Sequence, residues 1–276
     1  MKKINIVIFL FCYLNIYSQQ QSILWKIEKD SVVSYILGTN HLFGESFLKE
    51  NKVTLHKIEE SNLVLAENIG ESYPIINARE DSSSTDFLNQ EQLKLLENIS
   101  SKKTSINKLQ LREIMIIIDR AWAKKSCLNN RERKDSLLLD NFIIKTAQEK
   151  GIQVGGLENP SVTLEYINKY TYEEYDDNRL KQIIVAKLNN INKNIKHSHC
   201  KIEKKYRNKN YEYNFNEKME HPILAERNVN WMEKIPNLIE EYKKVFIAVG
   251  IAHLDYENGL LNLLKHKGYK VTPIKI

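Results

Sequence analysis

Four apolar, strand-like segments of this chain each end just before a histidine or a glutamate. His41 and His253 each close a Gly-x-x-His motif, and Glu67 and Glu158 each come directly after a short, largely apolar run. The carboxyl ends of parallel strands meet at one edge of a sheet, where ligands bind. We therefore expect the four side chains to lie close together. Two imidazoles with one or two carboxylates are a ligand set for Zn²⁺, Mn²⁺, Co²⁺ or Fe²⁺.

The two histidines also have an ordinary interpretation, as strand-end residues held by local hydrogen bonds. A single histidine would favour that interpretation, but the motif occurs twice, each time after an apolar run and before a leucine. Gly38 and Gly250 open the two motifs. Without a Cβ atom, they allow a sharp turn and a close approach of the backbone to a bound group. The repetition favours a functional site.

Two further charged residues are candidates for roles at this edge. The guanidinium of Arg227 can hold a substrate carboxylate or stabilise an oxyanion, or it can form an ion pair that fixes its helix. Asp140, in a helical pattern with an apolar face, can orient a ligand histidine from behind or make a structural hydrogen bond. At the level of the sequence, both pairs of alternatives remain open.

Short runs of β-branched and other apolar residues predict the strands that position these side chains. The predicted strands are Ile23–Ile27, Val32–Leu37, Leu63–Ala66, Ile152–Val154, Val245–Val249 and Lys270–Ile274. Because they alternate with helical patterns, they indicate an α/β fold. We expect a mostly parallel or mixed central sheet flanked by helices.

Apolar residues at helical spacing predict the helices, and most of these lie in the middle of the chain. The predicted helices are Val53–Glu60, Thr85–Ile99, Leu111–Lys125, Ser136–Lys150, the basic segment Tyr172–Tyr206, a helix that includes Glu226–Trp231, and Gly259–Lys267. Ser84 or Thr85 is the expected N-cap of the second helix. The region 80–240 is too long for simple crossovers, so we expect a large helical middle region that forms a layer or cap.

The N-terminus has the pattern of a secretory signal peptide. Lys2 and Lys3 precede an apolar run, and the small residue Ser18 follows it. We expect residues 1–18 to be a cleaved signal and 19–276 to form one α/β domain, exported to the periplasm or the extracellular space. No apolar stretch reaches the roughly 20 residues of a membrane-spanning helix. In an oxidising compartment the remaining cysteines, Cys127 and Cys200, either pair or stay as isolated thiols.

Composition limits the class of protein. The chain has 276 residues, of which 42% are hydrophobic and 28% charged, so it can fill a core and is not a long disordered segment. The net charge of +6 falls to +4 when the two lysines of the signal are removed, which argues against a nucleic-acid partner. The sequence shows no nucleophile elbow and no phosphate-binding loop.

Several stretches of the chain are similar to the TraB/PrgY/GumN family. The opening motif Tyr35-Ile36-Leu37-Gly38-Thr39-Asn40-His41, the C-terminal run Gly250-Ile251-Ala252-His253-Leu254 and the pair Arg227-Asn228 resemble that family's motifs. Glu67, Asp140 and the segment Gly156-Leu157-Glu158 match it in order and spacing. The resemblance covers nearly the whole chain after the signal.

The resemblance implies the α/β fold that this family shares with erythromycin-esterase-like and ChaN-like proteins. TIKI proteins of the same superfamily are metal-dependent peptidases, and by position His41, Glu67 and His253 would be the metal ligands. Mn²⁺ or Co²⁺ is the favoured ion, with Zn²⁺ as a further possibility. We therefore predict a secreted metal-dependent hydrolase, a peptidase, in which Glu158 or Glu67 is the general base. The alternative is a non-enzymatic secreted protein that sequesters a peptide or small molecule in the same pocket.

Overall fold

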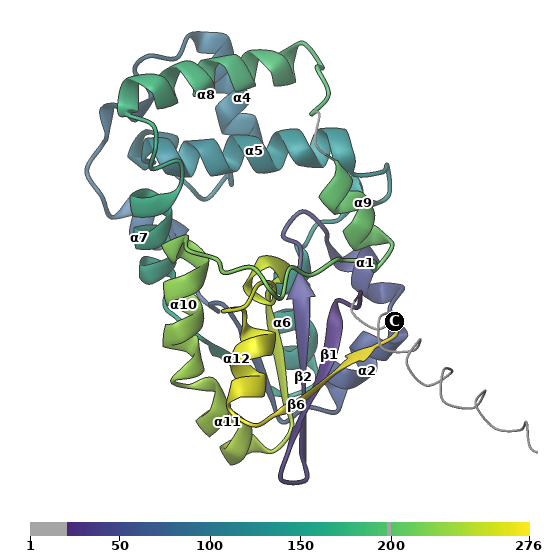
Figure 1. The fold of residues 1–276 in the computed structure, drawn as a ribbon. Coiled ribbons are helices and arrows are strands. Elements are labelled where there is room, and N and C mark those ends of the chain that lie inside the picture. The colour runs from purple at the N-terminus through teal and green to yellow at the C-terminus, as the bar shows by residue number, and fades with distance from the viewer. Residues whose placement is uncertain (1–20, 198–199) are drawn as a thin grey trace, which may run out of the picture.

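The structure, a computed structural model, describes residues 21–197 and 200–276, and its centre is a six-stranded sheet (Figure 1). The strands are β1 (Leu24–Lys29), β2 (Val32–Thr39), β3 (Leu63–Ala66), β4 (Gln153–Gly156), β5 (Val245–Gly250) and β6 (Lys270–Ile274). Their order across the sheet is β4-β3-β5-β2-β1-β6. The pairs β4–β3, β3–β5 and β5–β2 are parallel, whereas β1 runs antiparallel to both of its neighbours. The predicted α/β class with a mixed central sheet is confirmed.

The central strands alternate their side chains between two hydrophobic cores, as a period of two residues requires. On β5, Val245, Ile247 and Val249 pack into one core, while Phe246 and Ala248 pack into the other. All five of these residues are buried. The sheet is therefore covered on both faces, which explains why the parallel strands read as nearly continuous apolar runs.

Different helices cover the two faces of the sheet. One face packs against α10 (Pro222–Met232), α11 (Ile235–Tyr242) and α12 (Leu260–His266). The other face packs against α1 (Glu45–Lys49), α2 (Lys52–Glu59), α6 (Leu139–Glu149) and α9 (Lys201–Arg207). Figure 1 shows these two groups on either side of the strands. The sheet and these helices form the lower body of the molecule in that view.

The remaining helices form a separate layer beyond one end of the sheet, and we call it the helical layer. It consists of α3 (Tyr73–Asn77), α4 (Gln90–Ile99), α5 (Leu111–Cys127), α7 (Pro160–Tyr170) and α8 (Asp177–Asn192). Its core contains Ile114, Met115 and Ile118 of α5 and Leu180 and Ile184 of α8. In Figure 1, α4, α5 and α8 lie above the strands. This layer accounts for much of the helical middle region that the sequence predicts at 80–240, whereas α6, α9, α10 and α11 of that region pack on the sheet.

Two predicted helices differ most from those in the structure, and the other predicted bounds agree within three residues at each end. The helix predicted at Thr85–Ile99 begins later, because Asn89 is its N-cap and accepts a hydrogen bond from Gln92 N at 2.9 Å; Thr85 belongs to a short 3-10 turn. The helix predicted at Tyr172–Tyr206 is wrong as a single element. It is divided into α8 and α9, and Asn194, with φ of 56°, adopts the left-handed conformation that ends a helix. The sequence analysis also missed α1, α3, α7 and α11.

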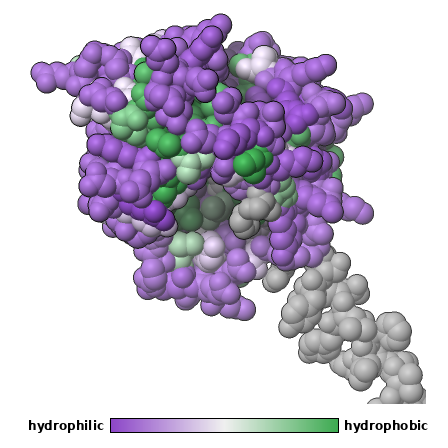
Figure 2. Space-filling model, turned by 90° about the horizontal axis from the view of Figure 1, so that it is seen from above, coloured by the Kyte–Doolittle hydropathy of each residue, from purple (hydrophilic) through white to green (hydrophobic). Residues whose placement is uncertain are grey.

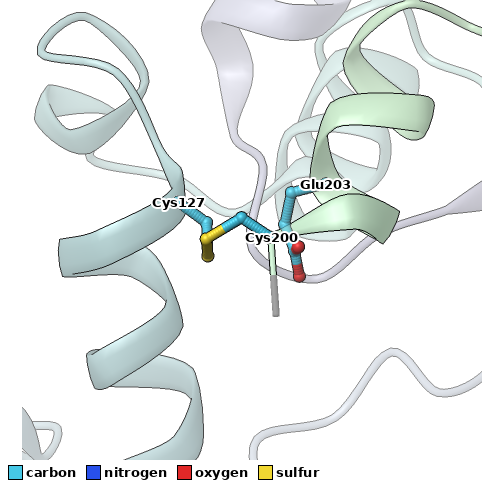
Figure 3. A group of neighbouring side chains, drawn as sticks. All are labelled: Cys127, Cys200 and Glu203. Atoms are coloured by element: carbon cyan, nitrogen blue, oxygen red, sulfur yellow. A yellow bond between two sulfur atoms is a disulfide. The ribbon is translucent and has the colours of Figure 1, made fainter. Parts of the chain in front are cut away.

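Cys127 and Cys200 form a disulfide with a Cα–Cα distance of 5.2 Å. Cys127 is the last residue of α5, and Cys200 immediately precedes α9 (Figure 3). The bond therefore joins the helical layer to a helix that packs on the sheet. Glu203 lies close to the two sulfur atoms, but a disulfide has no thiolate to offer a metal. Of the two states that the sequence left open for these cysteines, the structure has the paired one.

Among the described residues, every helix is too short or too polar to cross a membrane. The predicted signal peptide, residues 1–18, lies outside the part of the chain that the structure describes.

Candidate functional site

The four residues that follow the apolar strands meet at one edge of the sheet. In the parallel register, Thr39 of β2 lies opposite Gly250 of β5, and Ala66 of β3 lies opposite Ala248 of β5 and Gly156 of β4. Four neighbouring strands thus end at the same level. The residues that follow them are His41, Glu67, Glu158 and the 3-10 turn Ile251–His253.

His41 is held from behind by a carboxylate. Its Nδ1 lies 2.8 Å from Asp140 Oδ2, and Thr39 donates its hydroxyl to the other oxygen of Asp140 at 2.6 Å. The negative charge of Asp140 raises the pKa of His41 above its ordinary value, although burial opposes this. The pairing assigns the Nδ1 proton to the hydrogen bond with Asp140. His41 Nε2 then faces Glu67 Oε1 at 3.8 Å.

His253 is held in the same way by an amide. Its Nδ1 lies 2.7 Å from Asn228 Oδ1, and Asn228 donates its Nδ2 hydrogens to the carbonyl oxygens of His253 and Asn258. Asn228 Oδ1 must therefore accept a hydrogen bond from the Nδ1–H of the ring. The imidazole is 3% exposed and packs against the ring of Trp231, and its burial lowers the pKa of His253 to about 3. His253 is thus neutral, and its Nε2 lies 3.9 Å from Glu67 Oε1.

Arg227 joins the buried acids of the site. Its Nη2 donates to Glu67 Oε2 and to Glu158 Oε1, each at 2.7 Å. Its Nη1 lies 3.1 Å from Nε2 of His253, which accepts the hydrogen bond. Burial raises the pKa of Glu67, but the positive charges of His41 and Arg227 and the hydrogen bond from Gly250 N–H outweigh it and hold that pKa well below its usual range. Of the two interpretations of Arg227, the structure contains the ion pair, and the acids are those of the site itself.

Glu158 has little free capacity for further hydrogen bonds. Besides Arg227, its oxygens accept from Trp231 Nε1 at 2.9 Å and from Thr163 Oγ1 at 2.7 Å. It is not among the described residues that line the cavity discussed below. Its contacts are those of a buried counter-ion that positions Arg227.

Close packing explains why both motifs begin with glycine. A Cβ atom at Gly250 would lie 3.0 Å from Glu67 Oε1 and 3.3 Å from His41 Nε2, and a Cβ at Gly38 would lie 2.7 Å from Cγ1 of Ile251. Neither glycine has a positive φ, so the expected sharp turn is not their role. They are needed because other atoms of the site approach the backbone too closely for a side chain.

A cavity of about 430 Å³ opens from this cluster toward the helical layer. Its floor includes His41, Glu67 and Asp140, and its walls come from α3, α5, α6 and α7. Figure 2 views the molecule from the side of the helical layer: the rim of this face is hydrophilic, and hydrophobic side chains show toward its middle. His41, Glu67 and Asp140 therefore lie at the bottom of a pocket of the size that small molecules and short peptides occupy, and His253, Glu158 and Arg227 lie behind them, outside its lining.

The donor atoms fit a divalent cation in part. Ligands bound at about 2.1 Å lie within about 4.2 Å of one another, and Glu67 Oε1 meets this distance to both imidazoles. The two Nε2 atoms are farther apart, since His41, Glu67 and His253 do not bring one ligand atom each to within 4.8 Å of one another. Within residues 21–197 and 200–276, the three residues that do so are Cys127, Cys200 and Glu203. Moreover, the guanidinium of Arg227 lies on His253 Nε2. His41 and Glu67 thus fit as ligands, and His253 would join them on leaving Arg227.

The fold and this site are those of an α/β protein with a histidine- and carboxylate-rich pocket at the carboxyl ends of its parallel strands. The sequence matches the TraB/PrgY/gumN family over residues 23–273, nearly the whole chain, and the protein belongs to this family. A comparison of this chain with curated proteins found no match, and neither did a comparison with solved structures.

The structure also brings residues to the site that the sequence analysis did not assign. Asn228 holds the ring of His253, and Thr39 donates to Asp140, which holds the ring of His41. Thr163 donates to Glu158. Thr39 lies inside the first Gly-x-x-His motif and Asn228 in the Arg227-Asn228 pair, and these positions were the available signal. The position of Thr163 depends on the packing of α7 and could not be inferred from its neighbours in the sequence.

Proposed function

We propose that this protein is a hydrolase of peptide-like substrates and that His41, Glu67 and His253 form its working centre with a divalent cation. One observation carries the proposal. Two imidazoles, each held at Nδ1 by an acceptor, turn their Nε2 atoms toward the same oxygen of Glu67, at 3.8 and 3.9 Å. Acceptors behind the rings of metal-binding histidines are the usual arrangement in metal sites.

In this proposal His41, Glu67 and His253 hold the ion, with Mn²⁺ or Co²⁺ favoured over Zn²⁺. When bound, such an ion polarises a scissile carbonyl and lowers the pKa of a coordinated water. Asp140 and Asn228 keep the two rings in the tautomer whose Nε2 carries the lone pair. Of the two carboxylates that could take the proton of the attacking water, Glu67 lines the cavity, whereas both oxygens of Glu158 are occupied by Arg227, Trp231 and Thr163. The guanidinium of Arg227 donates to the oxyanion that develops on the substrate.

One contact favours a second candidate, the same hydrolysis without a metal. Arg227 donates to His253 Nε2 and occupies the position that a third ligand needs. In that arrangement His41 Nε2 is the general base, and Asp140 stabilises the imidazolium that forms, as in other carboxylate–histidine pairs. Arg227 keeps its role toward the oxyanion.

We also propose that the protein is exported and acts in the periplasm or outside the cell, with residues 1–18 removed as a signal. The Cys127–Cys200 disulfide supports this proposal, since such bonds persist in oxidising compartments.

The deciding experiment combines metal analysis with turnover on the purified protein, residues 19–276. A pool of synthetic peptides is incubated with wild type, with His41→Ala and with His56→Ala, and products are identified by mass spectrometry. His56, with a side chain 63% exposed on α2, is the matched control. We expect bound metal and turnover in wild type and His56→Ala, and neither in His41→Ala.

A chelator separates the candidates. Loss of turnover with a chelator and recovery with Mn²⁺ or Co²⁺ supports the metal-dependent hydrolase. Turnover that resists the chelator and is lost in His41→Ala supports the metal-free hydrolase. Peptides that are retained but never cleaved would replace both with the binding protein.

A further inference from the structure

Helix α5 turns one face toward the cavity above the site. Glu113, Ile116, Ile117 and Arg120 all line the cavity, and their spacing of three, four and seven residues places them on one side of a helix. Arg120 is the last of them. It also lines a neighbouring pocket between α7 and α10, so its side chain lies where the two spaces meet.

Three of the four acidic side chains that line this cavity, Glu67, Glu113 and Asp140, already have partners. Glu113 accepts hydrogen bonds from both terminal guanidinium nitrogens of Arg79, at 2.8 and 3.0 Å, and a third from the side-chain amide of Asn168. Asp140 is bound to His41, and Glu67 to Arg227. These acids are therefore not available to neutralise a further cation.

The side chain of Arg120, in contrast, makes no hydrogen bond and no ion pair with any residue of the described ranges 21–197 and 200–276. Its side chain is exposed to the solvent of the cavity. The surrounding protein lowers the pKa of the guanidinium, while the charges of Asp140 and Glu67 oppose that effect. A guanidinium stays charged under all ordinary conditions. An unpartnered cation thus faces the same space as His41 and Glu67.

We propose that Arg120 binds a carboxylate of the substrate and thereby selects acidic peptides. This inference rests on the proposed function, because it places the substrate in the cavity above His41. The planar guanidinium can bind a carboxylate with two parallel hydrogen bonds, a geometry that gives specificity as well as affinity. Arg120 is then a specificity-determining residue, separate from the groups that touch the scissile bond.

The charge of the surroundings favours a carboxylate over a phosphate. Glu67, Glu71, Glu113 and Asp140 line the same cavity. One guanidinium balances a single negative charge there, whereas a dianion would face unbalanced repulsion from these acids. Apolar side chains occupy the wall between them, among them Ile117, Ile144, Leu164 and Ile167. The cavity therefore suits an acidic group with an apolar residue beside it.

Two carboxylates of a peptide have this chemistry: its C-terminus and a glutamate side chain. Four acetylated hexapeptides of alanine and leucine distinguish them. They carry one internal glutamate or glutamine, and end in a free acid or an amide. Dissociation constants are measured by calorimetry, and cleavage of the same peptides is followed by mass spectrometry. The proteins compared are wild type, Arg120→Gln, Arg120→Lys and Lys124→Gln. Lys124, one turn along α5 and outside the cavity lining, is the matched control for loss of one positive charge.

We expect wild type and Lys124→Gln to bind one carboxylate-bearing form at least tenfold more tightly than the neutral peptide. In Arg120→Gln this ratio should fall to about one with affinity for the neutral peptide unchanged, and Arg120→Lys should keep part of it. The better of the two acidic forms identifies the carboxylate. Melting curves show whether each variant is folded.

Equal ratios in wild type and folded Arg120→Gln, a wild-type preference for the neutral peptide, or no binding of any peptide would overturn the inference. Binding preference without cleavage would refute the proposed hydrolase and leave the role of Arg120 standing. Cleavage without any preference for a carboxylate would support the proposed hydrolase and refute the role of Arg120.

Discussion

Gly250 donates its backbone N–H to Oε1 of Glu67 at 2.7 Å. This bond links the end of β5 to the residue after β3 and fixes the oxygen that both histidines face. A side chain on Gly250 would approach that same oxygen to 3.0 Å. The absence of a Cβ atom is therefore part of how the site is built.

Gly250→Ala should impair the site more than the fold. The new methyl group displaces Glu67 and His41 by a few tenths of an ångström, which we expect to reduce turnover at least tenfold and stability by about 1–2 kcal/mol. Turnover and urea unfolding measure the two effects. Gly155→Ala, where the added atom meets only the ends of the Leu65 and Leu63 side chains, is the control and should retain turnover. Equal activity in both variants would contradict the prediction.

The two histidines should differ in their contribution to stability. The sequence places His253 after an apolar strand, which suggests little stability cost on its removal, but the structure buries its ring against Trp231. His253→Ala should therefore lower the free energy of unfolding by roughly 2–4 kcal/mol. The His41 side chain is 38% exposed, and His41→Ala should cost about 1 kcal/mol or less. Both variants should lose turnover. Comparable losses of stability in urea unfolding would be inconsistent with this assignment.

Removal of the guanidinium of Arg227 should destabilise the fold strongly. Arg227→Met leaves Glu67 and Glu158 buried without their common partner, and breaking a buried pair in this way costs about 3–5 kcal/mol. The double variant Arg227→Met with Glu158→Gln should recover part of the loss, because one buried charge is then gone. A double-mutant cycle of unfolding free energies gives the coupling, and additive losses would argue against it.

Reduction of the Cys127–Cys200 bond should lower stability by about 2–4 kcal/mol, since the closed loop spans 73 residues of sequence separation. Thermal melting of the protein with and without a reductant measures this, and the Cys127→Ser and Cys200→Ser double variant should match the reduced protein. A double variant that melts with the oxidised wild type would show that the bond contributes nothing.

The ion pair between Glu132 and Arg207 should make stability sensitive to acid. Burial raises the pKa of Glu132, but two hydrogen bonds from Arg207, at 2.5 and 2.7 Å, outweigh it and hold this pKa below its ordinary value. The folded state therefore binds the proton less readily than the unfolded state. The stabilisation is complete above the unfolded pKa of about 4.5 and is lost as the pH falls through the folded value. Urea unfolding between pH 3 and 7 should show a flatter acid limb for Glu132→Gln, and identical limbs would contradict the assignment.

The sequence predicts the sheet well because its central strands, such as β3 and β5, are buried on both faces. All six predicted strands occur within two residues of their expected bounds. Two missed helices had visible signals: α7 and α11 carry a proline at their start, and α11 places Ile235, Leu238, Ile239 and Tyr242 along one face. These signals are short and were outweighed by the polar residues between them.

Within the site, the histidines and Glu67 could be found because they follow strands whose ends align in register. The proposed role of Arg120 could not be found from the sequence, because nothing in its neighbours along α5 shows that its guanidinium lacks a partner. That property depends on how the helical layer packs over the sheet. The burial of His253 likewise depends on α10, which brings Trp231 against its ring.

The order of the strands determines when the pocket can exist during folding. β5 lies between β3 and β2 and brings His253 from near the end of the chain, while β6, the last strand, pairs with β1, the first. Such contacts between distant segments form late, because a long loop must close before they contribute stability. A nascent chain that ends before β5 has neither Gly250 nor His253. The pocket therefore becomes competent only when almost the entire polypeptide has been made and folded.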